Sequence, residues 1–155
     1  MCQLVGSVKN LFAKSFCRSL DPKGRLLLPP EYRDVLTQEN ASGSFVLTGR
    51  DGYLVGYRPE QWREIENALL KITNPSANLN IFLAKFLGRA EELTPDGQGR
   101  VRIPQPLLRE AALTKDVQIV GMLRTFQIWD QSRFDAMQAQ DVSEELAALG
   151  IQVPF

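Results

Sequence analysis

Histidine is absent from this chain of 155 residues, and only two cysteines are present. Histidine is the commonest general base and the commonest metal-binding side chain, so its absence removes the usual basis of both kinds of site. Cys2 and Cys17 stand apart, without the Cys-x-x-Cys spacing of a zinc site or a disulfide framework. Nucleotide-binding glycine loops and the Gly-x-Ser-x-Gly motif are missing as well. We therefore predict that the protein is not an enzyme, holds no metal and uses no cofactor or small-molecule substrate.

Long apolar runs are also missing. No stretch approaches the roughly 20 apolar residues that a membrane-spanning helix needs. The polar residues of the segment 6–10 interrupt any apolar run that would serve as a signal peptide. We therefore expect a cytoplasmic protein without a membrane partner. The length suits one domain, or two small ones that share a core.

The chain does contain an internal repeat. The segments Asp21-Pro22-Lys23-Gly24-Arg25 and Asp96-Gly97-Gln98-Gly99-Arg100 share the pattern Asp-x-x-Gly-Arg and lie 75 residues apart. Each is followed by an apolar run that ends in proline, at residues 26–29 and 101–104. Because the neighbours recur along with the motif, we interpret the two segments as copies of one structural unit.

The local sequence predicts the elements of each unit. Proline and glycine in 21–24 indicate a turn between two strands, and Asp51-Gly52 indicates a hairpin. Apolar residues at helical spacing predict two helices between the copies, and we expect their apolar stripes to pack in the core. The expected strands are 16–20, 25–28, 45–49, 53–57, 117–123 and 126–130, and the expected helices are 31–36, 59–72, 78–88 and 143–150.

Charge is balanced overall but unevenly distributed. The formal net charge is zero at pH 7, yet residues 9–33 carry six bases against two acids. Residues 130–155 carry one base against five acids. The basic surplus coincides with the first copy of the motif, and such a local surplus is typical of a nucleic-acid-binding surface.

The motif itself suits anion recognition. An aspartate at the start of a turn accepts hydrogen bonds from backbone N–H groups further along, and glycine allows the sharp reversal. The arginine then projects from the following strand and suits contact with a phosphate or a guanine edge. An ion pair between the aspartate and the arginine that only stabilises the turn is the alternative. Because the first copy has Lys23 where the second has Gln98, we expect the first copy to bind more strongly.

The residues from Leu20 to Arg33 are similar to the swapped-hairpin AbrB/SpoVT DNA-binding motif. Two tandem copies, the linking segment 86–90 and the segments 120–121 and 126–130 resemble the MraZ family, from about Leu11 to Leu149. The resemblance implies an α+β, mainly β fold. In it, two swapped-hairpin repeats form a pseudo-symmetric double-split β-barrel with flanking helices. The corresponding units here are 15–61 (first repeat), 62–89 (linking helices), 90–133 (second repeat) and 134–155 (C-terminal helical tail).

The resemblance also implies a function. Members are sequence-specific bacterial DNA-binding regulators, mostly repressors, of their own operon in the division and cell-wall gene cluster. They bind G-rich direct repeats in double-stranded DNA, which places them at the nucleoid, and they assemble into homo-oligomeric rings. In a ring, several weak basic surfaces act together, so a subunit of zero net charge can still bind DNA. An antitoxin-like protein-interaction module of the same fold class is the alternative.

The signature arginines of the family fall on Arg25 and Arg100. Lys23, Lys14 and Arg18 complete the predicted DNA-binding set, and the turn residues are Asp21, Gly24, Asp96 and Gly99.

Three features depart from the family pattern. Ala13 stands where the family usually has an arginine, ten extra residues precede Leu11, and one extra residue separates Arg100 from Arg109. The first ten residues are either an arm or the product of a gene start assigned too far upstream. We expect the extra residue in the second copy to shift the turn after its motif.

Overall fold

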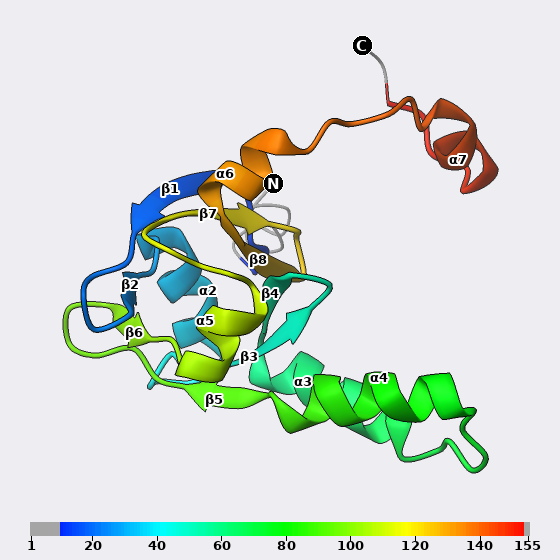
Figure 1. Cartoon of the computed structure of the whole chain (residues 1–155), viewed down its shortest axis with the longest axis horizontal. Coiled ribbons are helices and arrows are strands. Elements are labelled where there is room, and N and C mark those ends of the chain that lie inside the picture. Colours follow the sequence, from blue (N-terminus) through cyan, green and yellow to red (C-terminus); the bar gives the residue numbers. More distant parts are fainter. Residues whose placement is uncertain (1–9, 154–155) are drawn as a thin grey trace.

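The computed structural model describes residues 10–153, so the expectation of an N-terminal arm falls almost entirely outside the described residues. Eight strands and the helices between and after them make up this part of the chain (Figure 1). The strands are β1 (Ser15–Ser19), β2 (Arg25–Leu27), β3 (Phe45–Arg50), β4 (Tyr53–Tyr57), β5 (Glu91–Leu93), β6 (Arg100–Arg102), β7 (Asp116–Gly121) and β8 (Thr125–Asp130). The helices are α2 (Pro30–Glu39), α3 (Pro59–Leu69), α4 (Ala77–Gly88), α5 (Gln105–Glu110), α6 (Gln131–Ala136) and α7 (Ser143–Ala148).

The six-stranded sheet joins the two repeats strand by strand. Its order is β1-β7-β8-β4-β3-β5, with antiparallel pairing throughout. Exchanging each strand for its counterpart in the other copy (β1 with β5, β3 with β7, β4 with β8) gives the same order read backwards. In the pairing of β4 with β8, Val55 lies directly opposite Gln127, its counterpart in the other copy. The two copies of the sequence repeat are therefore related by a pseudo-twofold axis in the fold.

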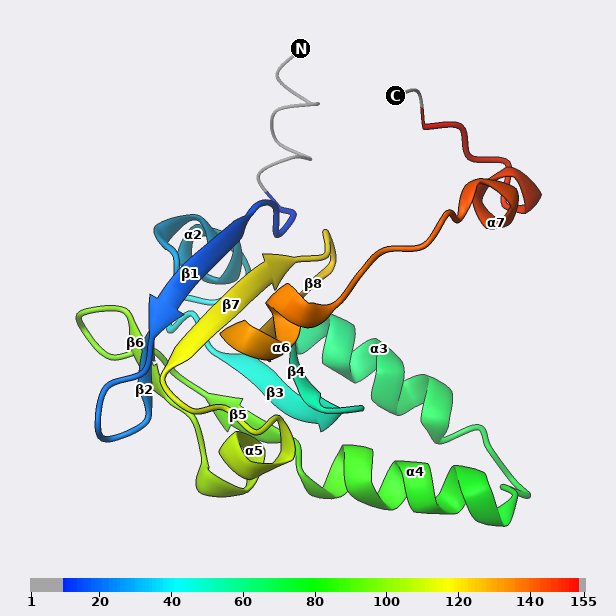
Figure 2. The ribbon, with the colours of Figure 1, turned by 45° about the horizontal axis from the view of Figure 1, so that its top comes forward.

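The two motif strands form a separate antiparallel ribbon on the same axis. In it β2 pairs with β6, and Leu26 lies opposite Val101 at the centre. Arg25 faces Arg102, and Leu27 faces Arg100. Both views place the ribbon and its two loops together, at the end of the body opposite the α3–α4 hairpin (Figures 1 and 2). The pairing thus brings the two copies of the motif to one surface.

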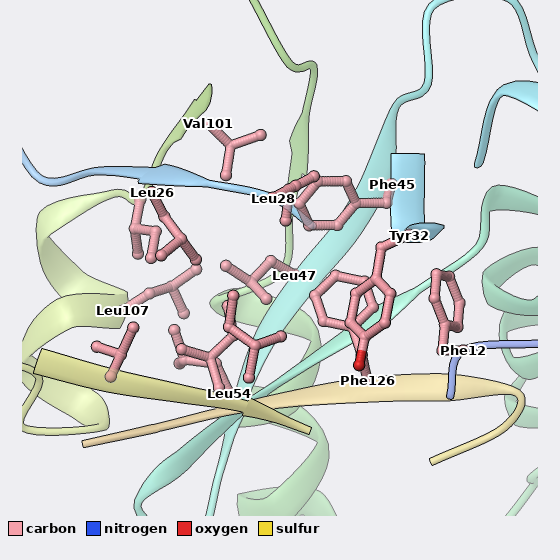
Figure 3. Close-up of a cluster of buried hydrophobic side chains, with 14 of the residues drawn as sticks. Phe12, Leu26, Leu28, Tyr32, Phe45, Leu47, Leu54, Val101, Leu107 and Phe126 are labelled. Atoms are coloured by element: carbon pink, nitrogen blue, oxygen red, sulfur yellow. The ribbon is translucent and has the colours of Figure 1, made fainter. Parts of the chain in front are cut away.

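One hydrophobic core lies between the ribbon and the sheet, with side chains from both repeats (Figure 3). Phe126 is the centre of an aromatic group, with ring centroids 5.1 Å from Phe12, 5.4 Å from Tyr32 and 5.3 Å from Phe45. These rings are fully buried, as are Leu26 and other aliphatic side chains around them. Burial of this kind stabilises a fold by about 25 cal/mol per Å² of apolar surface. Neither repeat could bury this surface alone, which explains why they fold as one unit.

The helices between the repeats pack less deeply than expected. Trp62 of α3 and Phe86 of α4 are buried in a second, smaller cluster, but Phe82 and Leu87 are largely exposed. The expected helix 59–72 ends at Leu69, because the next residues form a tight turn before α4. The prediction that both stripes pack in the core was therefore wrong for Phe82 and Leu87 of α4 and for Ile72, which lies beyond the end of α3.

The chain after α6 extends away from the body to α7 (Figures 1 and 2). None of the side chains of α7 is buried. Of the apolar end 151–155, the last two residues lie outside the described part. Within residues 10–153, no helix has the length and apolar content to cross a membrane.

The fold prediction is confirmed at its coarser level. The structure mixes helices and strands, has a mainly β core and contains two interleaved repeats. The strand pairings give a six-stranded sheet and a ribbon rather than a closed barrel among the described residues. The double-split barrel thus stays a prediction, as do the boundaries of the four units.

Candidate nucleic-acid interface

The first motif folds into a tight loop held by its aspartate. The N–H of Asp21 donates to the carbonyl of Arg25 (3.0 Å), and that of Gly24 donates to the carbonyl of Asp21 (2.9 Å). The side chain of Asp21 accepts two more bonds through Oδ1, from the N–H groups of Lys23 (2.9 Å) and Arg25 (2.8 Å). Gly24 has φ of +75°, which residues with a side chain rarely adopt. The motif therefore fixes the loop mainly by bonds within it, and the N–H of Ile103 in the other repeat adds one bond to the carbonyl of Gly24 (3.0 Å).

The second motif repeats the same bonds. Asp96 Oδ1 accepts from the N–H groups of Gln98 (2.9 Å) and Arg100 (3.0 Å). The backbone bonds of Asp96 with Arg100 and of Gly99 with Asp96 are both 2.9 Å long. Gly99 has φ of +82°. Two segments far apart in sequence thus form loops with the same hydrogen-bonding pattern.

Each aspartate also pairs with the arginine of its own motif. Arg25 donates through Nε to Oδ2 of Asp21 at 2.5 Å, and Arg100 to Oδ2 of Asp96 at 3.3 Å. The backbone N–H of Arg25 is the largest cause that lowers the pKa of Asp21, and the N–H of Arg100 lowers the pKa of Asp96 in the same way. Both carboxylates are therefore charged at neutral pH, which is unsuited to an acid–base dyad.

The ion pair that we considered as the alternative role of the motif is present in both loops. It uses only the Nε–H of each guanidinium, which carries five N–H donors in total. Within residues 10–153, no hydrogen bond uses the Nη atoms of Arg25 or Arg100. The aspartate thus orients the guanidinium and leaves its outer donors for another molecule.

Strand alternation places a row of arginines on the outer face of the ribbon. Leu26 and Val101 point into the core, so their neighbours point outward. The outward residues are Arg25, Leu27, Arg100 and Arg102. Three of these four are arginines, and two of them pair with the aspartate of their own loop, so the ribbon face carries a surplus of positive charge although the chain is neutral.

The neighbours of the two loops differ. A Cβ added to Gly24 would lie 3.2 Å from Cδ1 of Leu108 in α5, whereas a Cβ on Gly99 would collide with the guanidinium of Arg33 in α2. Leu108 and Arg33 occupy equivalent places, since the N–H of each bonds to the proline carbonyl four residues before it. The expected shift of the turn after the second motif was wrong, because Pro29 and Pro104 precede α2 and α5 in the same conformation. The extra residue instead moves Arg109 one position further along the helix. Each loop is therefore contacted by a helix of the other repeat, and next to the glycine itself the first loop has a leucine where the second has a guanidinium.

The other predicted cations lie at different distances from the loops. Lys23 is exposed on the first loop. Arg18 lies on β1 just before this loop, with its guanidinium 5.3 Å from the Phe16 ring centroid. Lys14 precedes β1, roughly 20 Å from the loop at the usual rise of a strand, and its Nζ is 3.8 Å from a carboxylate oxygen of Glu31. The structure brings Lys23, Arg25 and Arg100 together but not Lys14, and the DNA contacts of all the predicted residues stay predictions.

Sequence reasoning assigned no role to Arg102, Arg33 or Arg109. Arg102 follows Arg100 by two residues in a strand, so the alternation of side chains could have placed it on the same face. Arg33 could not have been found this way, because its contact with Gly99 depends on how the repeats interleave. Across residues 10–153, no three histidine, cysteine, aspartate or glutamate side chains gather as a metal site would require.

Comparison with known proteins gives one consistent result. A family described as "MraZ protein, putative antitoxin-like" matches residues 11–81 and 86–149. A protein of Nitratidesulfovibrio vulgaris strain Hildenborough is 49% identical over 94% of this chain and 99% of its own length. Proteins of strain Miyazaki F of that species (43%; 92% and 98%) and of Oleidesulfovibrio alaskensis (44%; 89% and 95%) are also similar. All three relatives are named transcriptional regulator MraZ.

Proposed function

This chain belongs to the MraZ family of transcriptional regulators, and from that premise we propose that it binds double-stranded DNA sequence-specifically through the β2–β6 ribbon. We further propose that it represses its own operon in the division and cell-wall gene cluster, and so acts at the nucleoid in the cytoplasm. Transcriptional regulators are not a class of enzyme, and no catalytic step enters this proposal.

The observation that carries the proposal is the pair of preorganised arginines on one ribbon. A two-stranded ribbon fits the major groove of B-DNA, which is about 12 Å wide. Arg25 and Arg100 each present free Nη donors, and an arginine can bond both O6 and N7 of a guanine. Because Asp21 and Asp96 already hold these side chains, little side-chain entropy is lost on binding. Guanine-rich targets agree with this geometry.

We propose that the protein assembles into a ring that presents several ribbons to one DNA. One ribbon with a few cations binds DNA weakly at physiological salt, and several on one assembly gain affinity through effective concentration. Exposed apolar side chains on α4, among them Ile81 and Phe82, supply surface that subunits could bury against each other. Identical ribbons in a ring suit direct repeats in the DNA.

The test is binding of the purified protein to the DNA upstream of its own gene. We expect tighter binding to this DNA than to a scrambled duplex of equal length and composition, measured by fluorescence anisotropy at fixed salt. Light scattering on the same sample should give a mass of several subunits. Equal affinity for the two duplexes would rule out sequence-specific binding, and a monomeric mass would rule out the ring.

A second candidate function, an antitoxin-like interaction module, is supported by the C-terminal arm. Leu149, Ile151 and Val153 are exposed on a segment that projects from the body (Figure 2). An antitoxin would use such a segment to hold a partner protein. Expression from the native locus with an affinity tag, followed by mass spectrometry, tests this. A stoichiometric partner that disappears when residues 141–155 are deleted would favour the antitoxin function over the regulator.

A further inference from the structure

Arg102 breaks the pseudo-twofold symmetry of the ribbon. Its counterpart in the first copy is Leu27, since the two residues stand two positions after Arg100 and Arg25. Cross-strand pairing places Arg102 directly opposite Arg25 and Leu27 directly opposite Arg100. The arginine that belongs to the second copy by sequence is therefore part of the first loop's surroundings in space.

The surroundings of Arg102 are basic. It lines a groove beside the first loop together with Lys23 of that loop and Arg109 of α5. Arg102 is exposed, and its side chain takes part in none of the hydrogen bonds or ion pairs found within residues 10–153. The groove also includes Asp21, but this carboxylate already bonds to Arg25. The cationic groups in the groove thus outnumber the anionic ones, which favours an external anion.

We propose that Arg102 contacts the DNA backbone beside the base pair that Arg25 contacts, so that the first DNA-binding loop is built from both repeats. The inference rests on the proposed DNA binding and assigns one further residue to it. A phosphate fits better than a base edge, because among the described residues no carboxylate orients the guanidinium of Arg102 as Asp21 orients that of Arg25. A phosphate contact adds affinity without adding sequence preference.

This contact would also give the ribbon a direction. A perfectly twofold-symmetric ribbon binds DNA equally well in two opposite orientations. The first loop has Lys23, Arg102 and Arg109 around it, whereas the second has Arg33 as its added cation next to Gln98 and Leu27, so one end of the ribbon attracts phosphates more strongly. A subunit can then distinguish the two directions of a direct repeat, which is not palindromic.

The test is Arg102→Leu, which places on β6 the residue found at the equivalent position of β2. We expect Kd to rise about threefold to tenfold for both the upstream duplex and the scrambled one. The slope of log K against log salt should become shallower by about 0.9 for each phosphate that the variant no longer neutralises. Leu27→Arg is the reciprocal variant, and it should tighten both duplexes and steepen the slope by a similar amount.

Two further variants keep the test interpretable. Arg102→Gln keeps a polar side chain without the charge and should match Arg102→Leu, which separates loss of charge from altered packing. Arg63→Leu removes an exposed arginine from α3, far from the ribbon, and should change neither Kd nor the slope. Unchanged binding by Arg102→Leu, or a weakening confined to the upstream duplex with the salt slope intact, would overturn the phosphate contact alone. Failure of the unmodified protein to bind the upstream duplex would instead overturn the DNA-binding function together with it.

Discussion

The two motif loops have the same internal bonds and different surroundings. In each, the aspartate accepts the same two backbone N–H groups and pairs with the arginine four residues later. The first loop has Lys23, the facing Arg102 and the apolar Leu108 around it. The second loop has Arg33 against its glycine and Leu27 facing its arginine. Local sequence thus builds the loop, while the other repeat supplies the environment in which it works.

This difference shows how a duplicated unit can specialise without losing its fold. The core and the strand pairing need both copies, so the motif turns are constrained in the same way on both sides of the axis. The outward positions of the ribbon and the helix positions over the glycines carry no such constraint. Divergence of charge at these positions changes what each loop attracts and leaves the packing intact.

Arg25→Ala should give the largest effect among single changes in the loops. Each bidentate arginine–guanine contact contributes about 1–3 kcal/mol of discrimination, and every subunit of a ring would lose it. We expect Kd for the upstream duplex to rise by about 100-fold or more, with a much smaller change for the scrambled duplex. Anisotropy at fixed salt measures both.

Arg25→Lys is the matched control for this change. Lysine keeps the charge but cannot make the bidentate contact, so specificity should fall while binding to the scrambled duplex is retained. The mass from light scattering should stay that of the unmodified protein in both variants. Retention of tight, specific binding by Arg25→Ala would show that Arg25 does not contact the DNA.

Arg100→Ala should have a smaller effect, a rise in Kd of about tenfold, within the range of one arginine–guanine contact. Its pairing with Asp96 is longer than that of Arg25 with Asp21, and Gln98 adds no charge to its loop. The ratio of the two effects, measured side by side on one duplex, is a direct measure of the inequality between the loops. A larger effect for Arg100→Ala would reverse the order and indicate that Arg33 makes the second loop the stronger one.

Much of the fold could be predicted because it is encoded locally. The proline and glycine of the motif correctly predicted its turn, although the strands on either side pair with the other repeat and not with each other. The Asp51-Gly52 turn and the apolar periodicity correctly predicted the β3–β4 hairpin and the main helices, with ends shifted by a few residues. The recurrence of the motif together with its neighbours also anticipated two equivalent units. These signals need only residues close in sequence or copies of one pattern.

The rest depends on contacts between residues that are distant in sequence. Nothing in the segment around Leu26 specifies that it will pair with Val101, yet this pairing decides that Arg102 faces Arg25. The exposure of Phe82 was missed because an apolar stripe on a helix does not say how much of it the body covers. The candidate site was therefore predicted at its motif residues and missed at the residues that the other repeat contributes.

Substituting the two motif glycines should have similar effects on stability but different effects on DNA binding. Both have positive φ, so Gly24→Ala and Gly99→Ala should each lower the free energy of unfolding by about 1–2 kcal/mol. Gly99→Ala also displaces the guanidinium of Arg33 and should weaken DNA binding more than Gly24→Ala does. Urea unfolding at one protein concentration and anisotropy measure the two effects.

A double-mutant cycle shows whether Arg33 is responsible for that difference. If Arg33 carries it, Gly99→Ala should cost little further DNA affinity in an Arg33→Ala background. Additive effects in the double variant would mean that Gly99→Ala acts through the loop backbone alone. The difference between Leu108 next to Gly24 and Arg33 next to Gly99 would then have no role in DNA binding.

The smallest expected effect is that of pH between about 5.5 and 8. The chain has no histidine, the side chain that usually titrates in this range. Backbone N–H groups of Arg25 and Arg100 lower the pKa of Asp21 and the pKa of Asp96, so both loops keep their charge well below neutral pH. The stability that these carboxylates contribute is present above the unfolded aspartate pKa of about 3.9 and is lost as pH falls through the lower folded pKa values.

NMR titration of the carboxyl carbons should therefore give both aspartates a pKa below about 3.9, with DNA affinity flat from about pH 8 to 5.5. Asp21→Asn removes one of the two titrations and assigns the other to the second loop, and a carboxyl that titrates at or above the ordinary value would show that its loop is not held by these bonds in solution.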